Sequence, residues 1–221
     1  MPLPQALRRL TPEQLRDDPR VRAIALGAGL IPPRTMHSPD EAATLARLAS
    51  GARRVVELGV YEGSSALVLL RAMGPESELV LVDPYTADTR WAALPQGAWA
   101  SATATRLAVG RARQTGGPSV RWILQRSQDV GRSWTGGPVD LVFIDGDHSY
   151  EGCRDDWKTW RDHVAPGGFA AFHDARAGTP GGRGAPGPTQ VVDETFRGGG
   201  EPGWTLADET DTLVVARRAD A

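Results

Sequence analysis

The sequence predicts an α/β protein with a doubly wound, mostly parallel sheet of seven strands, a Rossmann-like arrangement with N-terminal helices and an antiparallel C-terminal hairpin. Short runs rich in Val, Leu and Ile recur from residue 54 onward, as is typical of strands buried on both faces of a parallel sheet. Helical patterns alternate with these runs, which indicates right-handed βαβ units. The length of 221 residues fits one α/β domain with terminal additions better than two domains.

Two helices are expected before the first strand. They begin near Thr11-Pro12 and at Ser38-Pro39, and Gln14 and Glu41 complete the capping-box pattern of each. The hydroxyl can accept an unpaired backbone N–H, and proline stands where no N–H is needed. We therefore expect a helical cap over residues 1–50 and a cofactor-binding domain over 51–221.

The remaining elements follow from the alternation of apolar runs and helical patterns. The expected strands are Arg54–Gly59, Glu78–Asp83, Val120–Leu124, Val139–Asp145, Gly168–His173, Trp204–Leu206 and Thr212–Ala216. The last two flank the polar, turn-rich stretch Asp208–Asp211 and predict the hairpin. The expected helices are Ser64–Met73, Gly97–Gln114, Tyr150–Val164 and Thr189–Phe196.

One segment, Arg176–Pro188, is too rich in Gly and Pro for a helix or a central strand. It is expected to be a loop after the fifth strand, at the carboxyl end of the sheet, where ligands bind in open α/β sheets. A mobile lid and an ordinary surface loop both remain open.

Composition excludes several classes of function. The formal net charge of −2 gives no global attraction to nucleic acid, and 40% hydrophobic residues suffice for a core. The single cysteine, Cys153, excludes an internal disulfide and falls in an expected helix, which favours a packing role over a nucleophile. The N-terminus lacks the apolar run of a signal peptide, and no window approaches the length of a membrane span. We expect a soluble, cytoplasmic protein without a membrane or nucleic-acid partner.

A glycine turn follows the first strand, which ends in Glu57 and Gly59. The turn runs through Gly63, and a helix opens near Ser64-Ser65. Gly59 would let the backbone approach a ligand, and the helix N-terminus would attract a carboxylate or phosphate. These glycines do not complete the dinucleotide fingerprint of three glycines, so an ordinary strand–helix turn is the alternative.

An acidic residue, Asp83, ends the second strand roughly 20 residues after the turn, where this fold class binds ribose hydroxyls. Its carboxylate can accept both hydrogen bonds of a cis-diol. The alternative role is a cap for the next element.

Polar residues also follow the fourth and fifth strands. Asp145, Asp147 and His148 come after the fourth, and His173-Asp174 ends the fifth. Carboxylates and imidazoles at strand ends suit metal ligation or acid–base chemistry. Asp145, His173 and Asp174 could converge on one point, because the carboxyl ends of parallel strands share one edge. Asp147 has a second interpretation, since it or Ser149 could cap the following helix.

From Met36 to Ala175 the sequence resembles the class I S-adenosylmethionine-dependent methyltransferases. It is most similar to the small O-methyltransferases typified by the catechol and caffeoyl-CoA enzymes, and closer still to the macrocin type, which modifies sugars and antibiotic intermediates. The motifs that carry this resemblance are MHSPDEAATLARLA, VVELGVYEGSSALVLL, VDPY, RSQDV, FIDGDHSYEGCRDDWKTW and PGGFAAFHDA.

The resemblance implies S-adenosylmethionine as cofactor and a role for each matching residue. Those expected to contact or flank it are Glu57, Gly59 and Tyr61 at the methionine half, Ser65 at its carboxylate, Asp83 at the ribose, Ser127 and Gln128 at the adenine, and Asp145. The expected catalytic residues, near the substrate hydroxyl, are Asp147, His148 and His173.

The resemblance also implies a divalent cation, usually magnesium, bound by Asp145, His173 and Asp174. The plant and mammalian relatives carry Asp-Asn where this chain has His173-Asp174, and histidine is a poor ligand for magnesium. Two possibilities follow. Either Asp145 and Asp174 bind the ion with His173 nearby, or no metal binds and His173 or His148 is the general base.

The expected reaction is methyl transfer to a hydroxyl of a small molecule: a sugar, a natural-product intermediate or a catechol. By analogy, the N-terminal helices could form a homodimer. One alternative is a metal-dependent oxygenase similar to cephalosporin hydroxylases, with His148, His173 and Asp174 as its triad. Another is a cofactor-binding module without catalysis. The residues that could shape a substrate pocket are Trp91, Trp99, Trp157, Trp160 and His37, although the spacing of Trp157 and Trp160 favours core packing.

Overall fold

The computed structural model describes residues 18–85, 100–113, 116–178, 184–198 and 200–220. The helix expected at Thr11-Pro12 lies outside these residues, as do Trp91 and Trp99. The same holds for the ends of the helix expected over Gly97–Gln114 and for the middle of the loop expected over Arg176–Pro188.

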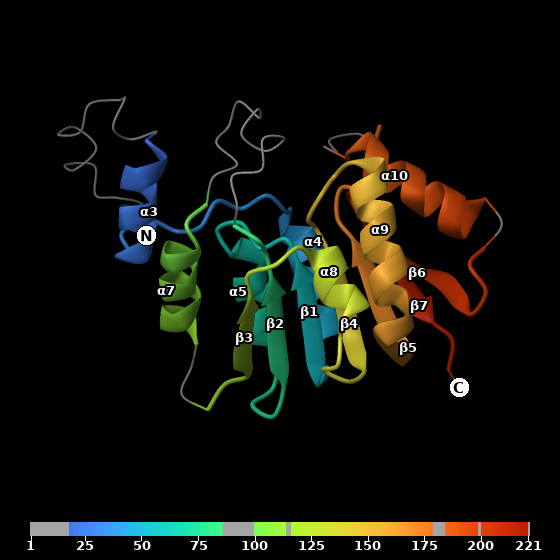
Figure 1. The fold of residues 1–221 in the computed structure, drawn as a ribbon, viewed down its shortest axis with the longest axis horizontal. Coiled ribbons are helices and arrows are strands. Elements are labelled where there is room, and N and C mark those ends of the chain that lie inside the picture. The colour runs from blue at the N-terminus through green and yellow to red at the C-terminus, as the bar shows by residue number, and fades with distance from the viewer. Residues whose placement is uncertain (1–17, 86–99, 114–115, 179–183, 199, 221) are drawn as a thin grey trace.

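The described residues form a seven-stranded sheet in the order β3-β2-β1-β4-β5-β7-β6 (Figure 1). The strands are β1 Arg54–Leu58, β2 Glu78–Val82, β3 Ser119–Ile123, β4 Val139–Ile144, β5 Val164–Phe172, β6 Trp204–Thr210 and β7 Leu213–Arg218. Strands β1 to β5 are parallel, and β7 is antiparallel to β5 and β6. This confirms the predicted fold class. The strand order reverses between β1 and β4, which is where open α/β sheets bind ligands.

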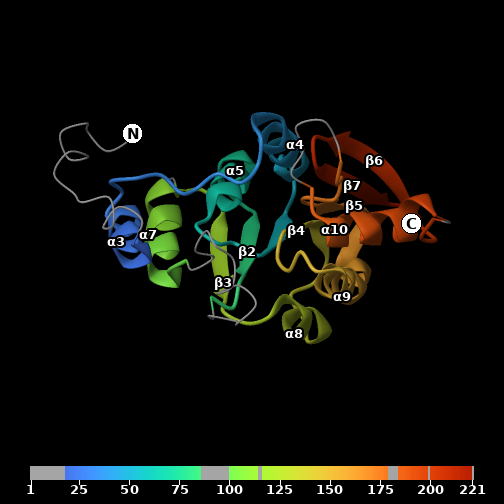
Figure 2. The same ribbon diagram turned by 90° about the horizontal axis from the view of Figure 1, so that it is seen from above.

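Helices cover both faces of the sheet (Figure 2). They are α3 Pro19–Gly27, α4 Pro39–Ala49, α5 Ser64–Ala72, α7 Ala102–Ala112, α8 Ser127–Arg132, α9 Tyr150–Trp160 and α10 Pro186–Val192, with a 3-10 turn over Arg161–His163 and a π-helical turn over Asp193–Arg197. Neighbouring strand residues face opposite ways, so Val55 packs under α4 and α5, whereas Val56 packs under α8, α9 and α10.

The first two helices of the described residues begin with side-chain caps. Ser38 and Glu41 form the predicted capping box of α4, in which each side chain accepts the other residue's backbone N–H. Asp18 caps α3 with its side chain alone, accepting from the backbone N–H of Arg20 at 2.7 Å. Helix α3 then packs on α7 through a small cluster around Leu26, away from the main sheet.

Several expected boundaries were wrong. Helix α9 ends at Trp160 instead of Val164, because Val164 already pairs with Val139 and starts β5 before the bulge at Gly167. Helix α10 begins inside the expected loop, since Pro186 stands in its first turn, where no N–H is needed.

The C-terminal hairpin also differs in its turn. Strand β6 continues to Thr210 through a register shift after Leu206, and the turn is Asp211-Thr212. The stretch Asp208–Asp211, expected as the turn, is therefore mostly strand. Helix α8 was not predicted, because its six residues are too few to give a helical period.

The tryptophans of α9 belong to the core. Trp157 is 2% exposed and Trp160 is fully buried, which confirms the packing interpretation. Trp157 contacts the rings of Phe172, Phe196 and Trp204. Cys153 is buried on the same helix, as expected of a packing residue. Among the described residues, no helix is both long enough and apolar enough to cross a membrane.

Candidate functional site

The glycine turn after β1 lies against the end of β4. Gly59 has a φ of +86°, and a Cβ at this position would lie 2.3 Å from the backbone oxygen of Asp145. The missing side chain of Gly59 makes room for the protein's own β4 loop, and its expected approach to a ligand stays a prediction. The turn and Asp145 are consequently held in direct contact.

Asp83, which follows β2, accepts hydrogen bonds from the same turn. Its Oδ2 accepts from the backbone N–H groups of Val60 at 2.9 Å and Tyr61 at 3.0 Å. Its Oδ1 accepts from the backbone N–H of Tyr85 at 2.7 Å, so Asp83 also caps its own loop. A carboxylate has about four lone-pair sites, which leaves one on Oδ1 for a further donor.

Glu57 is fully buried at the end of β1. The Ser65 hydroxyl donates to its Oε1, whereas its Oε2 has no hydrogen-bond partner among the residues that the structure describes. Burial raises the pKa of Glu57 well above its usual value, against the lowering effect of Ser65. The sequence placed Glu57 and Ser65 separately at a cofactor, and in the fold they form one hydrogen-bonded pair.

The polar residues after β4 and β5 come together. One ligand atom from each of Asp145, His148 and His173 lies within 4.8 Å of the others. His173 Nδ1 is 2.9 Å and His148 Nε2 is 3.5 Å from Asp145 Oδ1. Asp174 borders this group, with its Oδ2 3.4 Å from His148 Nε2 and 3.7 Å from His173 Nδ1. Of the expected trio, His173 lies close to both Asp145 and Asp174, but the group within 4.8 Å contains His148 instead of Asp174.

These residues carry strongly shifted pKa values. Burial lowers the pKa of His173, but the charge of Asp145 and contacts with Asp145 and Glu41 outweigh it and raise the pKa to about 11. For His148, burial is likewise outweighed by Asp145 and Asp174, which raise the pKa to about 10. Burial opposes ionisation of Asp145, but His173 and His148 hold its pKa well below the usual range. With no cation bound, neither ring is available to accept a proton near neutral pH.

Asp147 does not join the group. Its Oδ1 accepts from the backbone N–H of Ser149 at 2.9 Å, and Ser149 in turn caps α9 by accepting from Gly152. The Asp147 side chain packs so closely on Gly152 that a Cβ there would clash with it at 2.4 Å. This geometry favours the capping interpretation for both Asp147 and Ser149.

The residues expected at an adenine begin α8. Ser127 donates its hydroxyl to Asp156 on α9, and its carbonyl accepts from Trp160 Nε1 at 3.0 Å. Gln128 follows on the same helix and is half-buried. Sequence reasoning missed Asp156, which is fully buried and whose Oδ2 has no hydrogen-bond partner in the described part of the chain. No local pattern distinguishes it from exposed Asp residues on a helix.

The contacts of two further acidic residues with the site were not predicted, because their partners are distant in the sequence. Glu62, in the glycine turn, accepts from Arg22 Nε at 2.6 Å, from Arg22 Nη2 at 2.5 Å and from the Arg34 backbone N–H at 2.7 Å. Glu41 lies 3.6 Å from His173. The segment before β1 is therefore attached to both the glycine turn and the histidine group. His37, in that segment, has a buried Nε2 without a partner among described residues.

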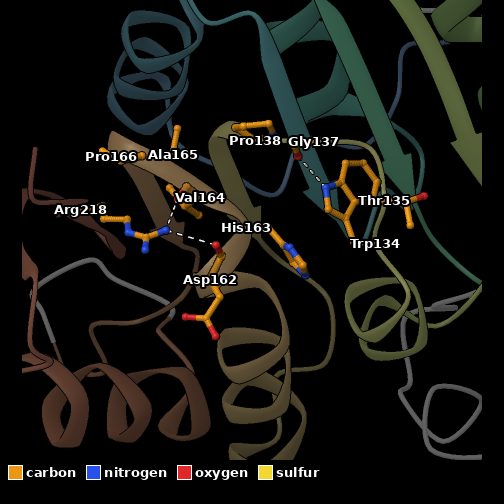
Figure 3. Close-up of a pocket in the computed structure, with 10 residues that line it drawn as sticks. All are labelled: Trp134, Thr135, Gly137, Pro138, Asp162, His163, Val164, Ala165, Pro166 and Arg218. Atoms are coloured by element: carbon orange, nitrogen blue, oxygen red, sulfur yellow. Dashed lines mark hydrogen bonds between the residues drawn. The ribbon is translucent and has the colours of Figure 1, made fainter. Parts of the chain in front are cut away.

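A surface pocket of about 400 Å³ lies at the opposite end of the sheet, where β4 and β5 begin (Figure 3). Several of its polar groups are already engaged: Trp134 Nε1 donates to the Gly137 carbonyl at 2.8 Å, and Arg218 donates to the carbonyls of Asp162 and Val164. His163 Nε2 lies 2.8 Å from the Gly131 carbonyl oxygen. The chemistry-bearing residues are therefore at the carboxyl end instead of in this pocket.

The chain is similar to known proteins in sequence. Residues 56–175 match the model of a protein family described as a methyltransferase domain. The chain is 29% identical over 207 residues to the catechol O-methyltransferase of Mycobacterium tuberculosis, covering 91% of this chain and 74% of the relative.

Two solved structures share the fold. One is the O-methyltransferase TomG from Streptomyces achromogenes, involved in tomaymycin synthesis and in complex with SAM, with a TM-score of 0.59, 19% identity and coverage of 95% of this chain and 91% of that chain. The other is an O-methyltransferase from Bacillus cereus in complex with SAH, with a TM-score of 0.60, 17% identity and coverage of 94% and 91%.

Proposed function

The chain belongs to the methyltransferase domain family and is an S-adenosylmethionine-dependent methyltransferase, and from this premise we propose that it methylates a hydroxyl of a small molecule with the help of a divalent cation. The observation that carries this proposal is the group of Asp145, His148 and His173, which adjoins the glycine turn through Gly59. The relatives are O-methyltransferases, which supports a hydroxyl acceptor.

The residues around the glycine turn fit the cofactor. S-adenosylmethionine supplies a methyl group on a sulfonium, already activated for transfer. Its ammonium and ribose hydroxyls are hydrogen-bond donors. Glu57 Oε2 is buried without a partner among the described residues, and an ammonium beside it would favour the ionised, accepting form. Asp83 retains a lone pair beside the turn, and Ser127 and Gln128 would flank the adenine. The protein's contribution is to hold these acceptors in place, since the reaction chiefly requires orientation.

The histidine group fits a cation, but magnesium is not the ion that it fits best. Nδ1 of His173 and Nε2 of His148 are buried and both face Asp145 Oδ1, at 2.9 Å and 3.5 Å. Two imidazoles with one carboxylate suit dications such as iron, cobalt or zinc, whereas magnesium prefers oxygen ligands. A bound dication would lower the pKa of the acceptor hydroxyl. We therefore propose Asp145, His148 and His173 as ligands.

The acceptor's proton needs a base outside the ligand set. Asp147 Oδ1 already accepts from the backbone N–H of Ser149, the N-cap of α9. The two histidines either bind the cation or, without one, favour the protonated form because their pKa values are raised. Asp174 is the neighbouring carboxylate, 3.4 Å from His148 and partly exposed. We propose that Asp174 Oδ2 takes the proton while Asp145 and the histidines hold the hydroxyl in place.

One other function has a specific observation in its favour. Two histidines and one carboxylate at a common point match the facial triad of iron-dependent oxygenases. The carboxylate of that triad would be Asp145, instead of the Asp174 expected from the sequence. Oxygen consumption with Fe²⁺ and a co-substrate would distinguish this function from methyl transfer.

The test is titration of the purified chain with S-adenosylhomocysteine, followed by methyl-transfer assays on catechol and sugar hydroxyls with Co²⁺, Zn²⁺, Fe²⁺ or Mg²⁺ and with a chelator. We expect micromolar binding and turnover that a chelator abolishes. An absence of cofactor binding would contradict the proposal. Turnover that persists in the chelator would contradict the cation's role alone.

A further inference from the structure

Glu41, on helix α4 before β1, lies against the histidine group. Its Oε2 is 3.6 Å from His173 Nε2, and both side chains are only 3% exposed. Residue 41 lies outside the matched residues 56–175, so the family match assigns it no role. At this depth solvent screens the pair of charges little, and each has a strong effect on the other.

Three hydrogen bonds fix the position of this carboxylate independently of His173. Glu41 Oε1 accepts from the backbone N–H of Thr212 at 2.9 Å and from its hydroxyl at 2.6 Å. Oε2 accepts from the backbone N–H of Ser38 at 2.8 Å, in the capping box. Helix α4 and the β6–β7 turn therefore hold Glu41 in place, and it faces His173 as a preset charge.

The opposite side of the His173 ring faces the proposed metal ligands. Nδ1 lies 2.9 Å from Asp145 Oδ1, so the ring stands between two carboxylates, one on each nitrogen. Histidines that ligate metals commonly present their second nitrogen to a carboxylate, which fixes the orientation and tautomer of the ring. Glu41 has the position of that second carboxylate.

We propose that Glu41 is a positioning residue for His173: it holds the Nε2–H side of the ring and so directs Nδ1 to a cation beside Asp145. This inference rests on the proposed cation-assisted function. It makes the segment before β1 a part of the site. It also implies that the hydrogen bonds of Thr212 to Glu41 contribute to the affinity of the site for its cation.

The test compares Glu41→Gln with a matched control, Thr44→Val. Glutamine is compatible with a capping box and removes the charge. Its amide accepts on one side only, so the variant also loses the hydrogen bonds at the other Glu41 oxygen. Thr44 lies on the same helix and shares a 3.1 Å hydrogen bond with Thr210 of the hairpin, so Thr44→Val weakens the same docking without touching His173. Thr212→Val is a second variant, which removes the hydroxyl that orients Glu41.

Two measurements on the full chain are required: the Kd and absorption spectrum of bound Co²⁺, and the ring ¹⁵N signals of His173 in cation-free protein. We expect Glu41→Gln to weaken Co²⁺ binding about 10- to 100-fold and to shift the ring signals, with Thr212→Val intermediate and Thr44→Val close to wild type. Equal Co²⁺ affinity and spectra in Glu41→Gln and wild type would overturn the inference.

The two proposals can fail separately. If wild type binds no divalent ion, the cation's role in the proposed function is wrong. The ring signals then decide the role of Glu41. A shift in Glu41→Gln alone supports it, and unchanged signals overturn it.

Discussion

The Nδ1 atom of His173 lies 2.9 Å from Oδ1 of Asp145, although the two residues follow different strands. The parallel pairing of β4 with β5 brings Ile144 opposite Phe172, so the residues that come next meet at the carboxyl edge. Gly59, which has no side chain, allows the glycine turn to contact the Asp145 backbone. The glycine turn and the histidine group are thereby joined through one residue.

Asp145→Asn should separate catalysis from cofactor binding. The variant loses the charge that His173 and His148 share, so we expect turnover to fall by at least about 100-fold. The affinity for S-adenosylhomocysteine should change by less than about threefold, because the loss is specific to the reacting groups. Titration and single-turnover assays measure the two quantities. A parallel loss of both would assign Asp145 to the cofactor instead.

Asp83→Asn should weaken cofactor binding. The carboxylate accepts backbone N–H groups from Val60, Tyr61 and Tyr85, and an amide can satisfy these donors only on its oxygen side. We expect the Kd for S-adenosylhomocysteine to rise by about tenfold or more, since hydrogen bonds to charged groups contribute about 1.5–3 kcal/mol. Asp162→Asn, a substitution of a side chain that is 80% exposed, is the control and should leave the Kd unchanged. Equal affinities in all three proteins would refute a role for Asp83.

Gly59→Ala should destabilise the fold. Its Cβ would lie 2.3 Å from the Asp145 backbone oxygen, and a φ of +86° is strained for alanine. We expect the free energy of unfolding to fall by at least about 2 kcal/mol. Gly110→Ala is the control, because that position within α7 is open, and alanine should raise stability there by about 0.5–1 kcal/mol. Urea denaturation compares them, and an unchanged midpoint for Gly59→Ala would contradict the close approach.

Asp156 should make stability depend on pH. Burial raises its pKa to about 7 from 3.8, against the hydrogen bond from Ser127 and with the charges of Asp147 and Asp155 adding to the rise. Between those pH values the folded protein binds more protons than the unfolded chain, so the free energy of unfolding falls as pH rises. Asp156→Asn should flatten this slope, measured by denaturation at several pH values.

The control for Asp156 is its neighbour Asp155, whose side chain is 44% exposed. Asp155→Asn removes a nearby charge without changing the buried group, so it should retain most of the slope. If Asp156→Asn keeps the full pH dependence of wild type, the buried carboxyl is not its source.

Sequence patterns predicted the parallel strands well because each is a local apolar run. The limits of β1 and β2 were expected to within a residue, and the capping box at Ser38 was identified from its own four residues. Helix α8 was missed because it is too short to show a period. The start of β5 was misplaced because Val164 joins the sheet only through its pairing with Val139.

The sequence by itself determined the fold class, the family resemblance and the acidic and imidazole residues at the strand ends, because these depend on short-range order along the chain. Only the tertiary structure decided which of them meet. It brought His148 into the group, tied Asp147 to a helix cap and set Glu41 against His173, a residue more than one hundred positions away. Such contacts depend on how helices and strands pack, and packing joins positions that no local pattern relates.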